Sequence, residues 1–514
     1  MHPALKISEI LRIMLQISDD HIRRRTAAAV AMTCRTFYEP GSDALWGDMP
    51  SLRPLLRCLP TDAVEKSGFH PVVAREAGGA QWARFVKHAA RVRTLKLTAV
   101  DFPQNERHMR VLLFMLSPEA PKVIPNLRTL EIALRESVSR AREGHGDVDI
   151  AYLPLLLGPR TQTLKLRTKK HIAHQVLVQA ALACPELKNL ELEGASQGYT
   201  TVLWHISSLE QIHFYESSSA ELLHPLDIAS MAYLPSLRQL SFPLPDRPRA
   251  ILQDQNTASG MFPALETLEI RRITSIPAFS SIIKSISSSR MQKLQICIPD
   301  IGDFDDFHDV IRRFAKFPML RCLSITGYAE SRRDFPVQLF LAKLAALEEL
   351  TISLDIWEVL PAHIPDLGRA WPRLRRLELL NDWDSPDPRT WPLDVLSGLG
   401  THLPHLEHLR ADMSAAIVPP LPAPGRAPRV RTLVVGRHSL RPKGDEWIMV
   451  RGYDEKWYNM ARYISQACPN ATMRCDESLP QNLSDRDRAQ FMKFDWKPWK
   501  QLAQEVGKLR RNAV

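Results

Sequence analysis

Pairs of apolar residues, separated by a single and mostly polar residue, recur along most of the chain. Each pair follows another residue, usually apolar, three positions before its first member, and a proline often stands two positions earlier still. The clearest copies begin at Leu127, Leu187, Leu237, Leu265, Leu320, Leu374 and Leu406. Weaker copies begin at Val92, Thr161, Leu209, Met291, Leu347 and Val430. This alternation places both members of a pair on one face of a β-strand.

The spacing of the copies predicts a repeated unit. Between Leu187 and Leu374 successive copies begin 22 to 29 residues apart, whereas the steps from Val92 to Leu127 and on to Thr161 are 35 and 34 residues. Helical patterns are expected between strands, at residues 107–116, 172–183, 303–317 and 337–345. Since one strand and one helix cannot bury their own apolar faces, the units must stack. We therefore expect an α/β solenoid over residues 91–436, a curved parallel sheet with helices on its convex side.

The repeats resemble leucine-rich repeats of the long, ribonuclease-inhibitor-like kind, from about Val92 to Val435. Units of that family run about 20–29 residues. The asparagine that often closes the family's strand segment is missing here. Residues between the paired apolar positions would face the hollow of the sheet and suit the binding of a target protein, although many could simply be solvated. The predicted target-binding residues are Glu131, Lys165, Glu191, His213, Glu269, Glu378 and Arg410.

The first fifty residues follow a different, helical pattern. Ser8 can cap a helix whose apolar face includes Ile10 and Leu15. A second helix is expected from Arg23 to about Cys34, and a turn at residues 38–41 leads to a third short helix that ends at Trp46. Three helices of this size make a small core, so we expect the module to need support from its neighbours.

Three short motifs in this module resemble the F-box, here at residues 1–50. They are Lys6 to Leu11, Thr33 to Phe37 and Leu45-Trp46, with Ser8 where the family usually has proline. Residues 48–60 also resemble the stretch after the F-box in mushroom-forming fungi, so the chain is similar to a basidiomycete-type F-box protein with leucine-rich repeats. The resemblance implies binding of a Skp-type adaptor, and through it a cullin. The adaptor-binding residues that it implies are Ile7, Ile10, Leu11, Leu15, Leu45 and Trp46.

This resemblance leads to three readings of function. The first is a substrate-recognition subunit of a Skp–cullin–F-box ubiquitin ligase, whose repeats hold an unknown target protein and which has no catalytic residue of its own. The second is a leucine-rich-repeat interaction scaffold with a degenerate F-box that joins no ligase. The third is a serine hydrolase that uses Ser196, because residues 194–198 match the G-x-S-x-G motif after a strand. The β-branched residues that follow are poor helix formers, which disfavours this third reading.

The rest of the chain is less informative. Residues 51–90 are expected to form a linker helix region, and residues 437–475 a C-terminal cap with a helix from Trp457 to Ala467. The repeat pattern is expected to be lost after residue 436. Residues 476–514 form a tail that could dock on a partner or be disordered, and the sequence leaves both open.

Charge and cysteine content narrow the classes of partner. The 514 residues carry 67 Lys and Arg against 57 Asp and Glu, and the basic pairs are scattered rather than clustered, so no nucleic-acid partner is expected. The seven cysteines form no C-x-x-C pair, which favours a reduced cytoplasmic or nuclear protein. No apolar run is long enough for a membrane span, so no membrane partner is expected. The chain is expected to be monomeric on its own.

No metal or cofactor is expected either. His402, His405 and His408 are spaced by three residues but have no acidic or cysteine partner at ligand spacing. The acidic run from Asp300 to Asp309 lacks the glycine and final glutamate of a calcium loop and suits a helix N-terminus. The sequence therefore predicts a protein without enzyme activity.

Overall fold

A computed structural model gives the architecture of most repeats. The structure describes residues 20–58, 79–98, 124–134, 156–168, 170–193, 199–215, 228, 231–244, 260–273, 275–298, 304–327, 344–353, 361–380, 391–411, 413–414, 420, 429–435, 453–475 and 497–511. The chain divides into two compact units, Met1–Phe242 and Pro243–Val514. Each unit is described by itself.

The first unit contains a parallel sheet whose strands follow chain order. Neighbouring strands pair in parallel from β1 to β7. The strands are β1 (Asp48–Met49), β2 (Thr94–Thr98), β3 (Thr129–Ala133), β4 (Thr163–Arg167), β5 (Asn189–Glu193), β6 (Gln211–Tyr215) and β7 (Gln239–Pro243). On the strands of this unit the apolar pairs of the sequence pattern are buried, so the strand prediction is confirmed there.

The second unit repeats the same arrangement. Its strands, again parallel and in chain order, are β8 (Thr267–Arg271), β9 (Lys293–Ile298), β10 (Cys322–Gly327), β11 (Glu349–Ser353), β12 (Arg376–Leu380), β14 (His408–Ala411), β16 (Thr432–Val435) and β17 (Thr472–Cys475). A separate two-stranded sheet pairs β13 (Trp391–Pro392) with β15 (Met413–Ser414). The predicted α/β class with repeated parallel strands is confirmed, while the curvature of the sheet stays a prediction.

The parallel register aligns equivalent residues of neighbouring strands. Leu95, Leu130 and Leu164 are aligned on β2, β3 and β4, and each is 0% exposed. A fully buried leucine contributes about 1.5–3 kcal/mol of transfer free energy. Backbone hydrogen bonds also link neighbouring repeats just before the strands begin. For example, the amides of Arg128 and Thr129 both donate to the carbonyl of Arg93. Burial of the apolar pairs therefore fixes which polar residues lie side by side on the opposite face.

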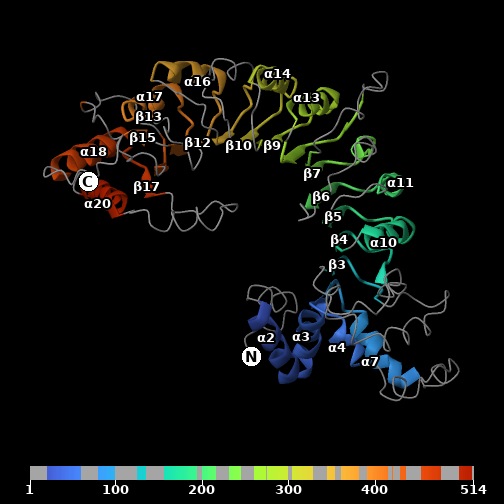
Figure 1. Cartoon of the computed structure of the whole chain (residues 1–514). Helices are drawn as coiled ribbons and strands as arrows, with labels where there is room; N and C mark the ends of the chain where they lie inside the picture. Colours follow the sequence, from blue (N-terminus) through green and yellow to red (C-terminus); the bar gives the residue numbers. More distant parts are fainter. Residues whose placement is uncertain are drawn as a thin grey trace, which may run out of the picture. The chain divides into compact units, whose positions relative to one another are not determined.

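Helices cover one face of the sheet in each unit (Figure 1). In the first unit they include α10 (Lys170–Ala183) and α11 (Thr200–Leu203). In the second they include α13 (Ile276–Ser285), α14 (Phe304–Phe314), η5 (Pro361–His363), α16 (Ile364–Ala370) and α17 (Val395–His402). The helices expected at residues 172–183 and 303–317 are confirmed in α10 and α14. Residues 107–116 lie outside the described residues, as do residues 337–343 of the fourth expected helix.

The N-terminal helices differ from the prediction at one point. Helix α2 (Asp20–Thr33) matches the expected second helix, but α3 (Arg35–Gly47) runs straight through the predicted turn at residues 38–41. The turn prediction is wrong. It rested on Pro40 and Gly41, since a proline inside a helix usually breaks the helix. Pro40 is buried in a tight packing of α3 on α2, and this tertiary contact overrides local propensity. The first expected helix, around residues 8–15, lies outside the described residues.

Both ends of the repeat region contain a strand that the sequence pattern missed. The first strand, β1, follows α3 directly. Two helices, α4 (Arg53–Leu56) and α7 (Gly79–Ala89), lie between β1 and β2, within residues 51–90, where a linker helix region was expected. The expectation that the repeat is lost after residue 436 is wrong, because β17 pairs with β16 after α18 (Tyr453–Ala467). The expected helix from Trp457 to Ala467 is confirmed in α18. Part of the predicted tail forms a further helix, α20 (Lys497–Arg511). Within the described ranges, no helix is both long and apolar enough to cross a bilayer.

Candidate protein-interaction surfaces

A row of alternating charge crosses the polar face of the first unit. The Lys96 Nζ atom lies 2.8 Å from Glu131 Oε1, and Lys165 Nζ lies 2.9 Å from Glu191 Oε1. These residues occupy the central position of β2 to β5, each in register with the next. Three predicted target-binding residues, Glu131, Lys165 and Glu191, are thus brought together, and each is paired with a charge of opposite sign.

An aromatic group continues the row on β6. The Tyr215 hydroxyl donates to Glu191 Oε2 at 2.7 Å, and the predicted residue His213 contacts Tyr215 edge-on at 4.3 Å between ring centroids. The Arg167 guanidinium lies 4.9 Å from the Tyr215 centroid. Burial raises the pKa of Glu191, but hydrogen bonds from Lys165 and Tyr215 outweigh this effect, so the pKa is lowered from its ordinary value. The sequence pattern did not single out Arg167 or Tyr215, because both stand at the ends of their strands.

The second unit has a different group, around Glu378 on β12. Arg376 Nε donates to Glu378 Oε1 at 2.8 Å, His408 Nε2 lies 3.2 Å from the same oxygen, and Arg410 Nη1 lies 3.6 Å from Oε2. Only 6% of the Glu378 side chain is exposed. Two predicted residues, Glu378 and Arg410, therefore meet here. The remaining one, Glu269, pairs with Arg271 of its own strand at 2.8 Å.

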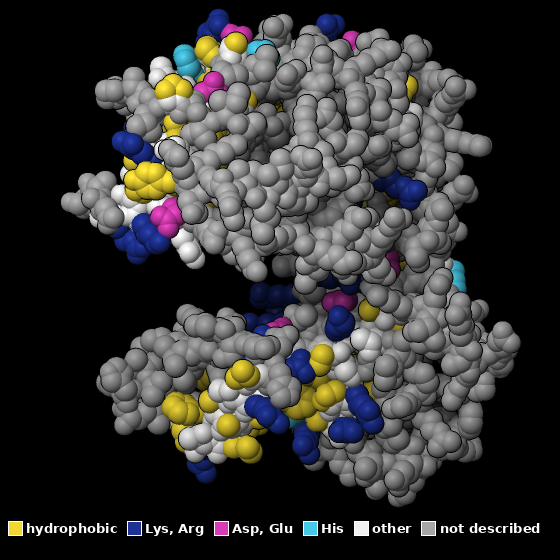
Figure 2. Space-filling model, turned by 60° about the vertical axis from the view of Figure 1, so that its left-hand side comes forward, with side chains coloured by type: hydrophobic (Ala, Val, Ile, Leu, Met, Phe, Trp, Pro, Cys, Tyr) yellow, Lys and Arg dark blue, Asp and Glu magenta, His cyan; other side chains and the backbone are white. Residues whose placement is uncertain are grey.

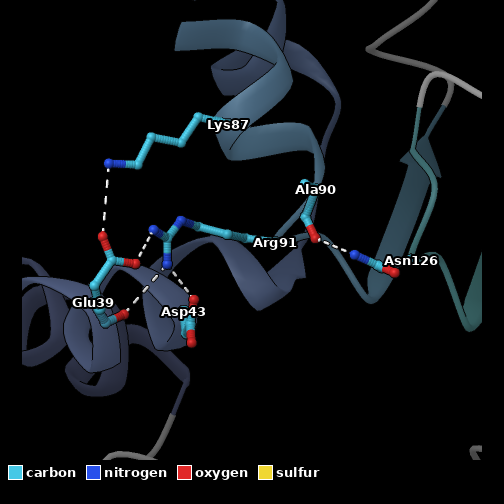
Figure 3. Close-up of polar contacts among 6 residues, drawn as sticks. All are labelled: Glu39, Asp43, Lys87, Ala90, Arg91 and Asn126. Atoms are coloured by element: carbon cyan, nitrogen blue, oxygen red, sulfur yellow. Dashed lines mark hydrogen bonds and ion pairs between the residues drawn. The ribbon is translucent and has the colours of Figure 1, made fainter. Parts of the chain in front are cut away.

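Helix α3 is held against the segment after α7 by one arginine (Figure 3). The Arg91 guanidinium bonds both Glu39 and Asp43 of α3, and Lys87 Nζ lies 3.6 Å from Glu39 Oε1. The hydrogen bond from Arg91 lowers the pKa of Glu39. Only 10% of the Arg91 side chain is exposed, so this contact is part of the packing between the helices and the repeats.

Backbone and ring contacts continue from this joint into the first repeats. The Arg93 amide donates to the Gly47 carbonyl at 2.9 Å, and Asn126 Nδ2 donates to the Ala90 carbonyl at 2.7 Å (Figure 3). The Trp46 ring stacks on His88 of α7, with centroids 4.2 Å apart. Burial lowers the pKa of His88, which favours the neutral ring in this stack.

Of the six predicted adaptor-binding residues, two can be placed. Leu45 and Trp46 are half-buried near the C-terminal end of α3, whereas Ile7, Ile10, Leu11 and Leu15 lie outside the described residues. The nearby helices expose Ile22, Met32, Tyr38 and Val86. Figure 2 shows such hydrophobic side chains among Lys and Arg in the lower part of the view. This mixture of apolar and basic side chains is a second candidate contact surface.

The candidate chemical sites gain no support. Ser196 lies outside the described residues, and the helix that follows it, α11, has only four residues. His402 ends α17, His405 is exposed in a turn, and His408 lies against Glu378. In the part of the chain that the structure describes, no three His, Cys, Asp or Glu side chains are grouped to hold a metal ion.

Comparison with known proteins assigns no family to the chain. No protein-family model and no curated protein matches the sequence. Among solved structures, the chain is similar to the crystal structure of human trophoblast glycoprotein (5T4, Wnt-activated inhibitory factor 1), with 17% sequence identity and a TM-score of 0.28. The match covers 44% of this chain and 81% of that one.

Proposed function

We propose that the chain is an interaction scaffold that links two proteins, an adaptor of the Skp type at its N-terminal helices and a target protein at its repeat sheet. Through the adaptor and a cullin, the bound target would be held near a ubiquitin-charged enzyme. The chain would then act by proximity alone, because positioning two reactants can by itself accelerate a reaction strongly.

The rigid joint between helices and repeats carries this proposal. Helix α3 ends at Gly47 and β1 begins at Asp48, so no flexible linker separates the helices from the first rung. Arg23 Nη1 lies 2.8 Å from Asp48 Oδ2, and Arg91 ties α3 to the segment after α7. A partner bound at these helices would keep a fixed orientation relative to the first repeats, as positioning by proximity requires.

The repeat face supports the target-binding half of the proposal. Its central residues project from strands that are held by buried apolar side chains, so the polar groups are preorganised. A surface that keeps its shape on binding loses less conformational entropy, which favours affinity.

Co-expression of the full chain with a Skp-type adaptor tests the adaptor half. We expect a stable complex in size-exclusion chromatography with light scattering. Leu11→Asp should abolish the complex, because the F-box resemblance places this apolar residue toward the adaptor. Leu182→Asp is the matched control: Leu182 on α10 is 78% exposed, so the same change there should leave the complex intact. Absence of any complex with the unchanged chain would refute the ligase role.

A scaffold that joins no ligase is the second candidate, and the Trp46 contact favours it. One face of the Trp46 ring is already used by His88 within the chain, so the ring is less available to an adaptor. This candidate predicts that the unchanged chain forms no adaptor complex and that Trp46→Ala lowers the stability of the free chain, because Trp46 then serves packing alone.

A further inference from the structure

Large apolar side chains are exposed at neighbouring places of the first unit, on the side of the sheet that the helices cover. Leu182, Trp204 and Tyr233 are 78%, 59% and 51% exposed. Each stands one or two residues before a buried residue that opens the turn into a strand; these buried residues are Cys184, Ile206 and Leu234. Because β5, β6 and β7 pair in register, the three turns lie at equivalent places of consecutive repeats.

A ring contact between Trp204 and Tyr233 joins two of these repeats. The ring centroids lie 6.1 Å apart with 62° between the ring planes, an edge-to-face arrangement that stabilises aromatic pairs. Each ring restricts the other, so the pair presents two inclined aromatic surfaces in a fixed arrangement. Trp and Tyr are among the side chains that most often dominate a binding energy, and preorganised side chains lose less entropy on binding.

The stretches of chain around this pair contain no formal charge. Residues 172–185, 199–209 and 228–237 include no Lys, Arg, Asp or Glu, although 24% of the residues of the whole chain are charged. Charges return at the turns into the strands, where Lys188 Nζ lies 2.8 Å from Glu210 Oε1. Nucleic acids and anionic membranes are bound through basic residues, so these stretches suit a neutral polypeptide instead.

We propose that Leu182, Trp204 and Tyr233 form a docking surface for an uncharged, proline-rich segment of a partner protein. The inference goes beyond the proposed function, because these residues lie on the helix side and none is assigned to the adaptor or to the target. Proline has no backbone N–H, and a polyproline II helix makes no internal hydrogen bonds, so such a segment offers free carbonyl acceptors. The Trp204 indole N–H and the Tyr233 hydroxyl are matching donors, and aromatic rings line the sites that bind proline-rich segments.

Fluorescence anisotropy with the full chain and a labelled poly-proline peptide tests the proposal. We expect saturable binding that stays constant as the salt concentration rises, because neither the peptide nor the three side chains carry charge. A labelled Gly–Ser peptide of the same length should not bind. Trp204→Ala should weaken poly-proline binding about thirtyfold, the effect of losing a residue that dominates a binding energy.

Tyr233→Ala and Tyr458→Ala are a matched pair of variants and keep the test valid if Trp204→Ala does not fold. Tyr458 lies on α18 of the second unit and is 48% exposed, close to the exposure of Tyr233. We expect Tyr233→Ala to weaken poly-proline binding about tenfold and Tyr458→Ala to leave it unchanged. Tyr233→Phe keeps the ring but loses the hydroxyl donor, and should weaken binding about threefold. Equal effects of the two alanine variants would show nonspecific adsorption of the peptide and overturn the proposal.

Two other results would also overturn the proposal. If the chain alone self-associates in light scattering and Trp204→Ala abolishes the association, a second copy of this chain is the occupant. If the unchanged chain does not bind poly-proline, the surface does not take proline-rich segments. Neither result bears on adaptor capture, which Trp204→Ala should leave unchanged in the co-expression assay.

Discussion

At the residue scale, one glycine determines how closely the N-terminal helices pack. A Cβ atom on Gly41 would lie 2.6 Å from the Ala31 nitrogen and 2.9 Å from the Ala27 carbonyl oxygen of α2. These are backbone atoms, which cannot move aside as a flexible side chain can. The small residues of α2 and α3 thus let the two backbones approach, and this contact is what keeps Pro40 inside a continuous helix.

Gly41→Ala should therefore destabilise the helix pair. We expect a loss of about 2 kcal/mol in the free energy of local unfolding, within the usual range for overpacking a close contact. Hydrogen exchange measured by mass spectrometry on peptides from α2 and α3 would detect the loss. Gly47→Ala is the control in the same helix, since a Cβ there meets nothing within 4 Å. Equal protection in the two variants would contradict this account of the packing.

At the element scale, the strands could be predicted from the sequence, but the side-chain contacts between neighbouring strands could not. The apolar pair of each strand, such as Leu190 and Leu192, signals its position by alternation alone. Stacking the apolar pairs aligns Lys165 with Glu191, but the ion pair between them also depends on side-chain conformation, which the alternation does not specify. Short strands escaped detection for another reason: β1 has two residues, and Met473 and Cys475 of β17 replace the leucine pair.

The same limit applies to the candidate site. Central positions between apolar residues could be assigned to the polar face, so Glu378 and Arg410 were expected there. Arg376 and His408 occupy the first positions of β12 and β14, and nothing in the sequence distinguishes them from solvated residues. Their role follows from the parallel register, which sets Arg376 beside His408 and Glu378 beside Arg410.

The joint at Arg91 connects two elements, and its contribution to the free energy of unfolding can be measured. Arg91→Gln should weaken the attachment of α3 to α7 and lower stability by about 1–2 kcal/mol, less than for a fully buried pair because Glu39 is 57% exposed. Limited proteolysis should then cut between α3 and α7 sooner. The control is Arg321→Gln, whose Glu348 partner is 3.9 Å away at an exposed site and should contribute below about 0.5 kcal/mol. Unchanged cleavage in Arg91→Gln would mean that the other contacts, such as the Trp46–His88 stack and the hydrogen bond from Arg93 to Gly47, hold the joint without Arg91.

At the scale of the whole molecule, a repeat array needs its terminal strands covered, because an open edge exposes the core and unpaired backbone groups. Helix α20 serves this purpose at β17. Leu502 and Val506 of α20 are buried, and Arg510 donates through Nη2 to the Cys468 carbonyl at 2.6 Å. The end of α18 and the turn before β17 are thereby closed by a helix in the region predicted as a tail.

Removal of α20 should open this end of the second unit, and Cys468 provides a direct reporter. Its thiol is 0% exposed, and burial raises its pKa to about 12, so in the full chain it should not react with a thiol reagent such as Ellman's reagent. A chain truncated after Trp496 loses Leu502, Val506 and Arg510, and one additional thiol should then react under native conditions. Cys468→Ser in the truncated chain should remove that signal, while truncation after Arg511 should leave the thiol protected. If the shorter chain gains no reactive thiol, the edge is closed by α18 and the repeats alone, and α20 is free to act elsewhere.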